Sequence, residues 1–360
     1  MTYILNKSAP VLNIRVGHQA RELILKEGVQ PQHVDIIPGA AGGPKGIGIH
    51  GLDQAIFGDF LARAPQKRTL IGSSIGSWRF ASIAARGAYA GTDLLAELYT
   101  HLSFHKKMTR FEVGDVCRVM LKELIQGYEQ RIIEHPDYHL TVLAVKSENI
   151  FKSDRTFPLL ASVLGIVASN SIARPKMRHF MQRVIVQPDA EPSFKIQDDG
   201  FLTHYCSLKQ ENLEDWLMAS ASIPVAVSGV RRIADAPEGV YRDGGLIDYH
   251  IDLPFQSKGL VLYPHFTARM TPGWFDNMWK SRKANPVNQA RTVLISPSQA
   301  YLDKLPLGRL PDRKDFTLKG LDQSQRIQLW KQSVAESQRL GDAFLEMVEK
   351  QNFDAFMQPL

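Results

Sequence analysis

The chain has 360 residues, of which 44% are hydrophobic and 22% charged, so it can form one large α/β domain with extensions or two modest domains. This composition excludes a low-complexity or disordered chain, and no run of about 18 apolar residues predicts a membrane-spanning helix. The formal net charge of +6 suits anionic partners, but a diffuse excess of lysine and arginine is usually a solvated surface, and we expect no nucleic-acid binding.

The first quarter of the chain alternates between helical and strand patterns. Helical periodicity covers residues 11–28, 46–62 and 75–89, and short buried strands are predicted at 34–40 and 68–73. Short buried strands that alternate with helices are typical of parallel β-α-β units with helices on both faces of the sheet.

The remaining strands are shorter and separated by longer helical stretches. Strands are predicted at 140–147, 184–188, 204–209, 239–243, 259–265 and 292–296. Helical stretches are predicted at 93–135, 158–183 and 211–220. Residues 301–313 have the composition of a Pro-rich linker, and a polar amphipathic helix is predicted over 322–350.

The segment LIGSSIGSW, residues 70–78, places Ser74 in a G-x-S-x-G motif between a predicted strand and a predicted helix. Such a nucleophile elbow is so tight that Gly72 and Gly76 must lack side chains, and it lifts the serine hydroxyl above the sheet edge. A helix that begins at Ile75 directs its positive end at this position and offers a backbone N–H to an oxyanion. A structural Gly/Ser turn is the alternative interpretation.

A second glycine-rich turn, PGAAGGPKGIGIHG at residues 38–51, also follows a strand and precedes a helix. Consecutive glycines at Gly42 and Gly43 let backbone N–H groups point into a cavity, as an oxyanion hole or a phosphate cradle requires. The P-loop pattern is not matched, because Gly46 follows Lys45 where a serine or threonine is needed. GIGIHG matches a dinucleotide fingerprint, but the next strand ends without an acidic residue to hold a ribose.

A carboxylate at the end of another short strand supplies a candidate base. In YRDGGLIDYHIDLPF, residues 241–255, Asp243 is followed by Gly244 and Gly245, although an Asp-Gly hairpin turn is the ordinary interpretation. An esterase triad would use a histidine after this aspartate, and His250 and His265 satisfy that chain order. Alternatively, a desolvated carboxylate takes the serine proton directly, because burial raises its pKa. The residues leave both mechanisms open.

In this order, the motifs resemble those of the patatin-like phospholipase family: GGPKG at 42–46, GSSIG at 72–76 and DGG at 243–245. ASASIPVAV at 219–227 resembles the small-residue segment that precedes the aspartate turn in that family. The resemblance covers roughly residues 34–265 and implies a three-layer α/β/α sandwich with a mostly parallel central sheet. It also implies a Ser-Asp dyad without a catalytic histidine.

On this resemblance, Ser74 is the nucleophile, Asp243 the base, and Gly42 and Gly43 the oxyanion donors. No cofactor or metal is expected, because backbone N–H groups supply the electrophilic help. The family loop usually reads D-G-G-G-x-R-G, so Lys45 stands where the family has an arginine. A lysine cannot form the bidentate hydrogen bonds that an arginine forms. Two alanines, at 40 and 41, stand where an aspartate and a glycine are expected, so the departures bear on substrate preference.

The resemblance divides the chain into an N-terminal helical extension over 1–30, an acyl hydrolase domain over 31–298 and a C-terminal linker with a helical extension over 299–360. Within TPGWFDNMWKSRK, residues 271–283, four apolar side chains lie near one face of a predicted helix, followed by three cations. They are Trp274, Phe275, Met278 and Trp279, with Lys280, Arg282 and Lys283. An aromatic face with flanking cations suits a lipid interface, and a helix packed on the core is the alternative.

We therefore expect a lipid acyl hydrolase of the phospholipase A or lysophospholipase type, with peripheral membrane contact through residues 274–283. The alternatives are a Ser-Asp-His esterase of the α/β-hydrolase type and a catalytically weak protein that binds lipids or partners. Cys117 and Cys206 form no CxxC pair, which favours a reducing compartment. Because residues 1–17 show no secretory-signal pattern, we expect a cytoplasmic location.

Overall fold

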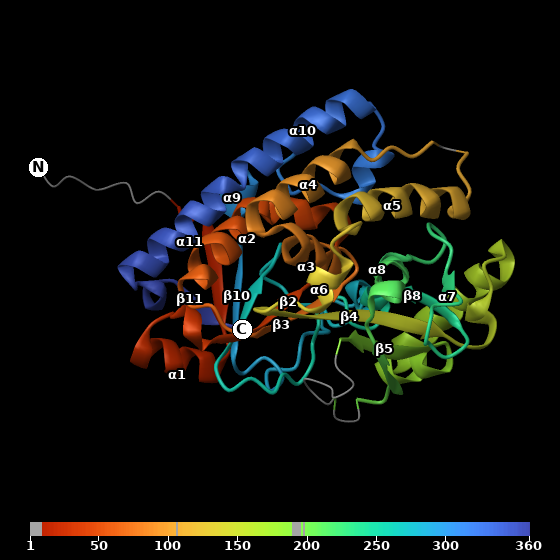
Figure 1. The fold of residues 1–360 in the computed structure, drawn as a ribbon, viewed down its shortest axis with the longest axis horizontal. Helices are drawn as coiled ribbons and strands as arrows, with labels where there is room; N and C mark the ends of the chain where they lie inside the picture. Colours follow the sequence, from red (N-terminus) through yellow and green to blue (C-terminus); the bar gives the residue numbers. More distant parts are fainter. Residues whose placement is uncertain (1–8, 106, 189–195, 197–198) are drawn as a thin grey trace, which may run out of the picture.

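The computed structural model describes residues 9–105, 107–188, 196 and 199–360 (Figure 1). Residues 1–8 of the expected N-terminal extension and residue 106 of the expected helical stretch lie outside the described residues. The strands are β1 (Leu12–Val16), β2 (Val34–Gly39), β3 (Arg68–Ser73), β4 (Tyr138–Ser147), β5 (Met181–Gln187), β6 (Thr203–Ser207), β7 (Val230–Arg231), β8 (Val240–Asp243), β9 (Leu260–Pro264), β10 (Thr292–Pro297) and β11 (Met357–Pro359).

The α-helices lie between these strands and at the C-terminal end. They are α1 (His18–Glu27), α2 (His50–Asp53), α3 (Ile75–Arg86), α4 (Ala88–His101), α5 (Arg110–Ile125), α6 (Glu129–Ile133), α7 (Thr156–Ile172), α8 (Leu213–Ala221), α9 (Gln299–Leu302), α10 (Gln323–Glu336) and α11 (Gln338–Lys350). Short helical turns important for the site are η2 (Gly43–Ile49), η8 (Gly244–Leu246), η9 (Trp274–Met278) and η10 (Arg313–Phe316).

Eleven strands of the described chain form one open sheet in the order β11-β1-β10-β9-β2-β3-β4-β5-β6, and β8 pairs with β4 and β7. The central strands β10, β9, β2, β3 and β4 are parallel neighbours, whereas β1 and β5 pair antiparallel with β10 and β4. The expected α/β fold with a mostly parallel sheet is confirmed. Because parallel strands end at the same edge, the turns that follow β2 and β3 are brought together.

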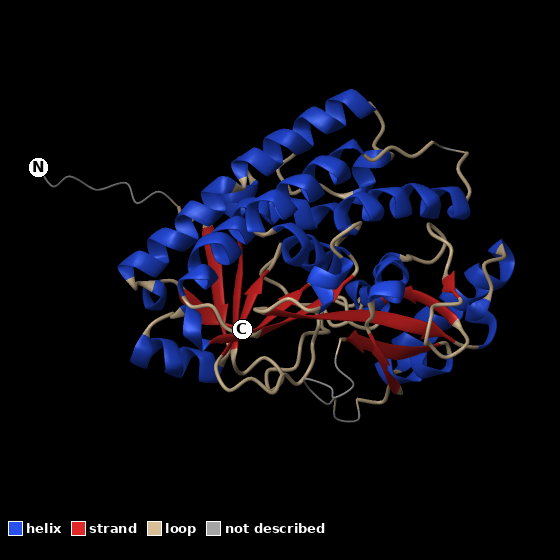
Figure 2. Cartoon of the chain, viewed as in Figure 1, coloured by secondary structure: helices blue, strands red, loops and turns tan. Residues whose placement is uncertain are grey.

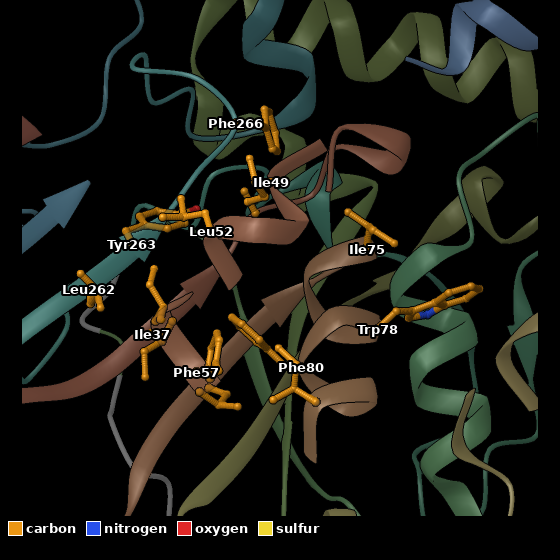
Figure 3. Packing of buried hydrophobic residues seen from close by; sticks show 14 of the residues in the cluster. Ile37, Ile49, Leu52, Phe57, Ile75, Trp78, Phe80, Leu262, Tyr263 and Phe266 are labelled. Carbon is orange, nitrogen blue, oxygen red and sulfur yellow. The ribbon is translucent and has the colours of Figure 1, made fainter. Parts of the chain in front are cut away.

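In Figure 2 the red strands lie among the blue helices. Alternating side chains of the central strands pack into separate core clusters, because successive side chains of a strand face opposite sides of the sheet. On one side, Ile37 of β2 packs with Phe57 and with Phe80 of α3, and the two aromatic rings lie 5.8 Å apart (Figure 3). On the other side, Ile71 of β3 packs with Ile251 of an irregular segment. Helix α7 covers the part of this side nearer β5.

The N-terminal residues depart from the prediction of a helix over 11–28. Leu12–Val16 form β1, which pairs with β10, and only His18–Glu27 are helical. The apolar side chains of LNIRV alternate, and this period-2 pattern places three of the five residues in the core. β1 therefore lies inside the sheet, and β11 from the C-terminal end pairs with it.

Three predicted helical stretches are shorter than expected or divided. Within the stretch 93–135, α4 ends at His101, α5 spans Arg110–Ile125 and α6 spans Glu129–Ile133. The stretch 158–183 ends as a helix at Ile172, and β5 begins at Met181. The single helix predicted over 322–350 is divided at Ser337 into α10 and α11. The Ser337 hydroxyl accepts the backbone N–H of Gly51 at 2.8 Å, which ties this division to α2.

Candidate active site

Ser74 occupies a strained turn between a strand and a helix. β3 ends at Ser73 and α3 begins at Ile75, and the intervening Ser74 has φ 55° and ψ −125°. A Cβ atom on Gly72 would lie 2.4 Å from the Ser77 backbone nitrogen, and one on Gly76 would lie 1.9 Å from the Gly39 oxygen. Both glycines are therefore required by close approach, and a non-glycine residue at positive φ is typical of a functional site.

Strand β4 aligns the two residues expected to act together. β3 pairs with β4 up to Ser73 opposite Leu143, and β8 takes over with Asp243 opposite Ala144. The opposite edge of β4 is occupied by β5, so β3 and β8 meet end to end on one edge. Asp243 is thus brought to the end of β3, where the turn with Ser74 begins.

The Ser74 hydroxyl donates a hydrogen bond to the Asp243 carboxylate. The distance from Oγ to Oδ2 is 2.8 Å, and both side chains are buried. The other oxygen, Oδ1, accepts the Gly245 N–H at 2.7 Å, and a Cβ atom on Gly245 would lie 2.9 Å from it. On the preceding glycine, Gly244, a Cβ atom would lie 2.3 Å from the Leu143 oxygen. Both glycines after the aspartate are therefore needed for this packing.

Burial makes the Asp243 carboxyl a stronger base than an exposed aspartate. Desolvation raises its pKa to about 6, although the hydrogen bonds from Ser74 and Gly245 and the charge of Arg313 oppose the shift. A carboxylate with this pKa is largely ionised at neutral pH and can accept a proton. The arrangement is chemically suited to remove the proton of the Ser74 hydroxyl.

The small-residue segment 219–227 contacts both sides of the Ser74–Asp243 pair. Ser220 Oγ accepts the backbone N–H of Ser74 at 2.9 Å and donates to the Leu143 oxygen at 2.6 Å. The carbonyl oxygen of Ser222 accepts the backbone N–H of Asp243 at 3.1 Å. These bonds explain in physical terms why small polar residues occur in this segment.

The glycine-rich loop after β2 lines the same small cavity as Ser74 and Asp243. Gly42 and Gly43 both line it, and Gly43 has φ +57°, a conformation that favours glycine. Among the described residues, no acceptor is recorded for the backbone N–H of either glycine or of Ile75, whereas the N–H of Ala41 bonds to the Tyr249 oxygen. Backbone N–H groups that are free of internal acceptors and lie beside a serine hydroxyl are suited to stabilise an oxyanion.

Two further residues of this loop have other roles. Lys45 does not line the cavity of Ser74: its Nζ lies 3.4 Å from Asp312 and borders a second cavity of about 290 Å³. Tyr249 lies between the two cavities and lines both. Gly46 permits close packing on α3, because its Cβ atom would lie 2.9 Å from the Ile75 side chain.

Neither candidate histidine is hydrogen-bonded to Ser74 or Asp243. His250 Nδ1 accepts the Thr271 N–H at 2.9 Å, and His265 Nδ1 contacts the Thr267 backbone. The two buried rings lie 4.4 Å apart, and neither Nε2 atom has a hydrogen-bond partner in the described part of the chain. Burial lowers the pKa of His265 to about 3 and that of His250 well below its usual value, so both rings are neutral at pH 7.

Several residues that line the Ser74 cavity have no motif of their own. Trp274 borders it from η9, and Arg313 borders it from the segment that the sequence suggested was a linker. The nearby carboxylates of Asp312 and Asp315 pair with Lys45 and Arg309, and the charge of Arg313 lowers the pKa of Asp243. The cavity holds about 20 Å³, roughly the space of one water molecule.

The structure differs from the single apolar face predicted for residues 274–283. Trp274–Met278 form a short 3₁₀ turn, in which Phe275 is buried in the core while Trp274 and Met278 are exposed. Trp279 is half-buried beneath the Arg282 guanidinium, which also bonds to Asp276 at 2.7 Å. These contacts favour the packed alternative for much of the segment.

No described helix is both apolar enough and long enough to pass through a bilayer. The described residues also hold no cluster of three or more metal-ligating side chains.

Neither a protein-family model nor a curated protein sequence matches this chain. Human GIVD cytosolic phospholipase A2 is similar in structure over 95% of this chain and 66% of its own, at 12% sequence identity and a TM-score of 0.39. VipD from Legionella pneumophila is similar over 75% of this chain and 56% of its own, at 13% identity and a TM-score of 0.28. This chain spans less than two thirds of the length of either protein.

Proposed function

We propose that the protein is a serine-dependent hydrolase of carboxylic esters, with Ser74 as the nucleophile and Asp243 as the base. The observation that supports this most strongly is the 2.8 Å hydrogen bond between Ser74 Oγ and Asp243 Oδ2. The strained backbone of Ser74 and the raised pKa of Asp243 support the same assignment. Ile223, Leu246 and Trp274 give the cavity apolar walls, which favours lipid acyl esters as substrates.

In the first half of the proposed reaction, Asp243 Oδ2 accepts the Ser74 proton as Oγ attacks the ester carbonyl carbon. The carbonyl oxygen becomes an oxyanion, which the backbone N–H groups of Gly42, Gly43 and Ile75 are placed to stabilise. Collapse of this intermediate breaks the bond to the alcohol oxygen. Asp243 returns its proton to that oxygen, so the alcohol leaves neutral and the acyl group remains on Ser74.

In the second half, water replaces the alcohol. Asp243 takes a proton from a water molecule as the water oxygen attacks the acyl carbon. The same N–H groups stabilise the second oxyanion. Collapse breaks the bond to Ser74 Oγ, which recovers its proton from Asp243. The products are a carboxylic acid and the regenerated enzyme.

Turnover of a soluble nitrophenyl ester and of a fluorescent phospholipid by the purified full chain tests the proposal. Ser74→Ala and Asp243→Asn should abolish both activities, since each removes one half of the proton transfer. Ser73→Ala is a matched control, because this neighbouring serine is fully buried and its hydroxyl has no hydrogen-bond partner in the described chain. Fluorophosphonate should label the Ser73→Ala protein but not the Ser74→Ala protein.

Substitution of the two histidines separates a dyad from a triad. For a dyad, folded His250→Gln and His265→Gln proteins should retain turnover within about tenfold of the native protein, or ~1.4 kcal/mol of barrier. A triad instead predicts a loss of about 10³-fold or more at one of them. Full turnover in Ser74→Ala would refute Ser74 as the nucleophile, and vesicle binding without any turnover would favour a binding protein.

A further inference from the structure

Helix α7 has an unusual outer surface for a helix at the edge of the protein. Its 17 residues, TFPLLASVLGIVASNSI, include no charged side chain. Phe157 is 83% exposed, Leu164 is 71% exposed and Ile172 is 69% exposed, while Leu160 is also exposed. A surface helix usually carries charged or polar residues on its outer side, so this surface requires another explanation.

The exposed apolar residues lie on one face of the helix. Phe157, Leu160, Leu164, Ala168 and Ile172 follow spacings of three and four residues, which place them in one row. The opposite face of α7 packs on the protein, because Leu159 and Ile166 are fully buried in a core cluster that also includes Phe275. The outer row is absent from the core clusters that the described residues form. We name Phe157, Leu160, Leu164 and Ile172 the outer face of α7.

Three exposed cations flank this apolar row. Arg155 precedes α7, and Lys176 and Arg178 follow it, and all three side chains are exposed. None of them has an ion-pair partner among the described residues. An apolar surface bordered by free cations complements a bilayer whose acyl region lies beneath anionic head groups.

We propose that the outer face of α7 docks on an anionic lipid surface, with the helix lying along the interface. Figure 1 shows α7 at the end of the molecule opposite α1 and α11, so this face is free of both. Asn170 of α7 donates a 2.9 Å hydrogen bond to Asp276 of η9, and η9 carries Trp274 of the Ser74 cavity. The docking face and one wall of the cavity therefore belong to the same packed unit.

Sedimentation with vesicles tests the docking without any need for hydrolysis. The native full chain should sediment with vesicles of phosphatidylcholine mixed with phosphatidylglycerol more than with phosphatidylcholine alone. The double variant F157E/L164E should bind at least about tenfold more weakly, because two apolar contacts are lost and two negative charges are added. A triple variant, R155Q/K176Q/R178Q, should remove only the preference for anionic vesicles.

A matched control carries the same two charges on other helices. L25E/V119E places glutamates at exposed apolar residues of α1 and α5, and it should bind vesicles as the native protein does. Equal loss in both double variants, or no loss in F157E/L164E, overturns the proposal, as does a native protein that does not sediment with vesicles. A native dimer that F157E/L164E converts to monomers also overturns it. Ser74→Ala should bind vesicles normally, so failure of docking and failure of the proposed hydrolysis are distinguishable.

Discussion

Ser220 of helix α8 is hydrogen-bonded to the turn that contains Ser74. Its hydroxyl oxygen accepts the Ser74 backbone N–H at 2.9 Å. The same hydroxyl donates to the Leu143 oxygen at 2.6 Å, so one side chain joins α8, the end of β3 and the middle of β4. Ser220 contacts no group that would react. It is a positioning residue, and its effect on activity should pass through Ser74.

Ser220→Ala should therefore lower kcat while KM changes little, because the nucleophile is displaced and the substrate contacts remain. Loss of the buried hydroxyl should also lower the free energy of unfolding by about 1–3 kcal/mol. Ester kinetics and thermal melting measure the two effects. Ser222→Ala is the control, since its hydroxyl bonds at 2.8 Å to Met218 in its own helix. Unchanged kcat in Ser220→Ala would contradict the positioning role.

The pH dependence of activity should follow the carboxyl of Asp243. Its pKa is raised to about 6 by burial, and only the ionised form accepts the serine proton. We expect kcat/KM for a soluble ester to decrease roughly tenfold per pH unit below about pH 6 and to level off above it. A profile that stays flat down to the usual aspartate range would show that another group is the base.

The free energy of unfolding should decrease with rising pH, whereas activity should increase. The pKa of Asp243 is raised in the folded state, so the protonated carboxyl favours folding. This contribution to the free energy of unfolding is complete below the unfolded pKa near 3.8 and is lost as pH rises through about 6. At pH 7, Asp243→Asn should raise the free energy of unfolding by up to about 3 kcal/mol, and the gain should disappear below about pH 4. Denaturant unfolding at both pH values measures this. The exposed Asp354→Asn should show no such gain.

Arg313 lowers the pKa of Asp243 through its charge, so its removal should move the acid limb of the activity profile. Arg313→Gln should shift the midpoint of kcat/KM to higher pH, because a neighbouring cation no longer stabilises the carboxylate. Lys314→Gln, an exposed neighbour in the same turn, should leave the midpoint unchanged. Equal shifts in the two variants would mean that net charge, rather than the position of Arg313, controls the base.

A side chain on Gly43 should obstruct the proposed oxyanion site. Gly43→Val places a branched side chain at φ +57°, with its Cβ atom 3.3 Å from Arg313, and should lower kcat by roughly 10²-fold or more. Gly127→Val controls for backbone strain, since Gly127 has φ +82° and nothing within 4 Å of its Cβ position. Near-normal turnover in a folded Gly43→Val protein would move the oxyanion site elsewhere.

The sequence predicts the parts of the fold that depend on local pattern. β2, β3 and α3 occur within a few residues of their predicted positions, because apolar runs and flanking glycines define them. β1 was not predicted, because Leu12, Ile14 and Val16 precede a true helix and extend its apolar pattern. The period-2 alternation of LNIRV is a short local signal, and pairing with β10 and β11 completes the strand.

The candidate site shows the same division between local and distant information. Ser74 and Asp243 can be identified from their turns, because strained or crowded backbone requires glycine at neighbouring positions. Arg313 and Trp274 reach the cavity only through long-range packing, and no local pattern distinguishes them from other surface residues. The small residues ASAS at 219–222 indicate that this segment packs closely against its neighbours. The hydrogen bond from Ser220 to Leu143 is visible only in the structure.

The end-to-end meeting of β3 and β8 on β4 has a consequence for biosynthesis. Ser74 and Asp243 are separated by 169 residues, so the proposed nucleophile is made long before its base. Closing such a long loop is slower than forming local helices, and β8 reaches the end of β3 only by pairing with β4. A nascent or partly folded chain therefore carries a serine without a proton acceptor. On the proposed mechanism, the chain can hydrolyse an ester only after β8 has paired with β4.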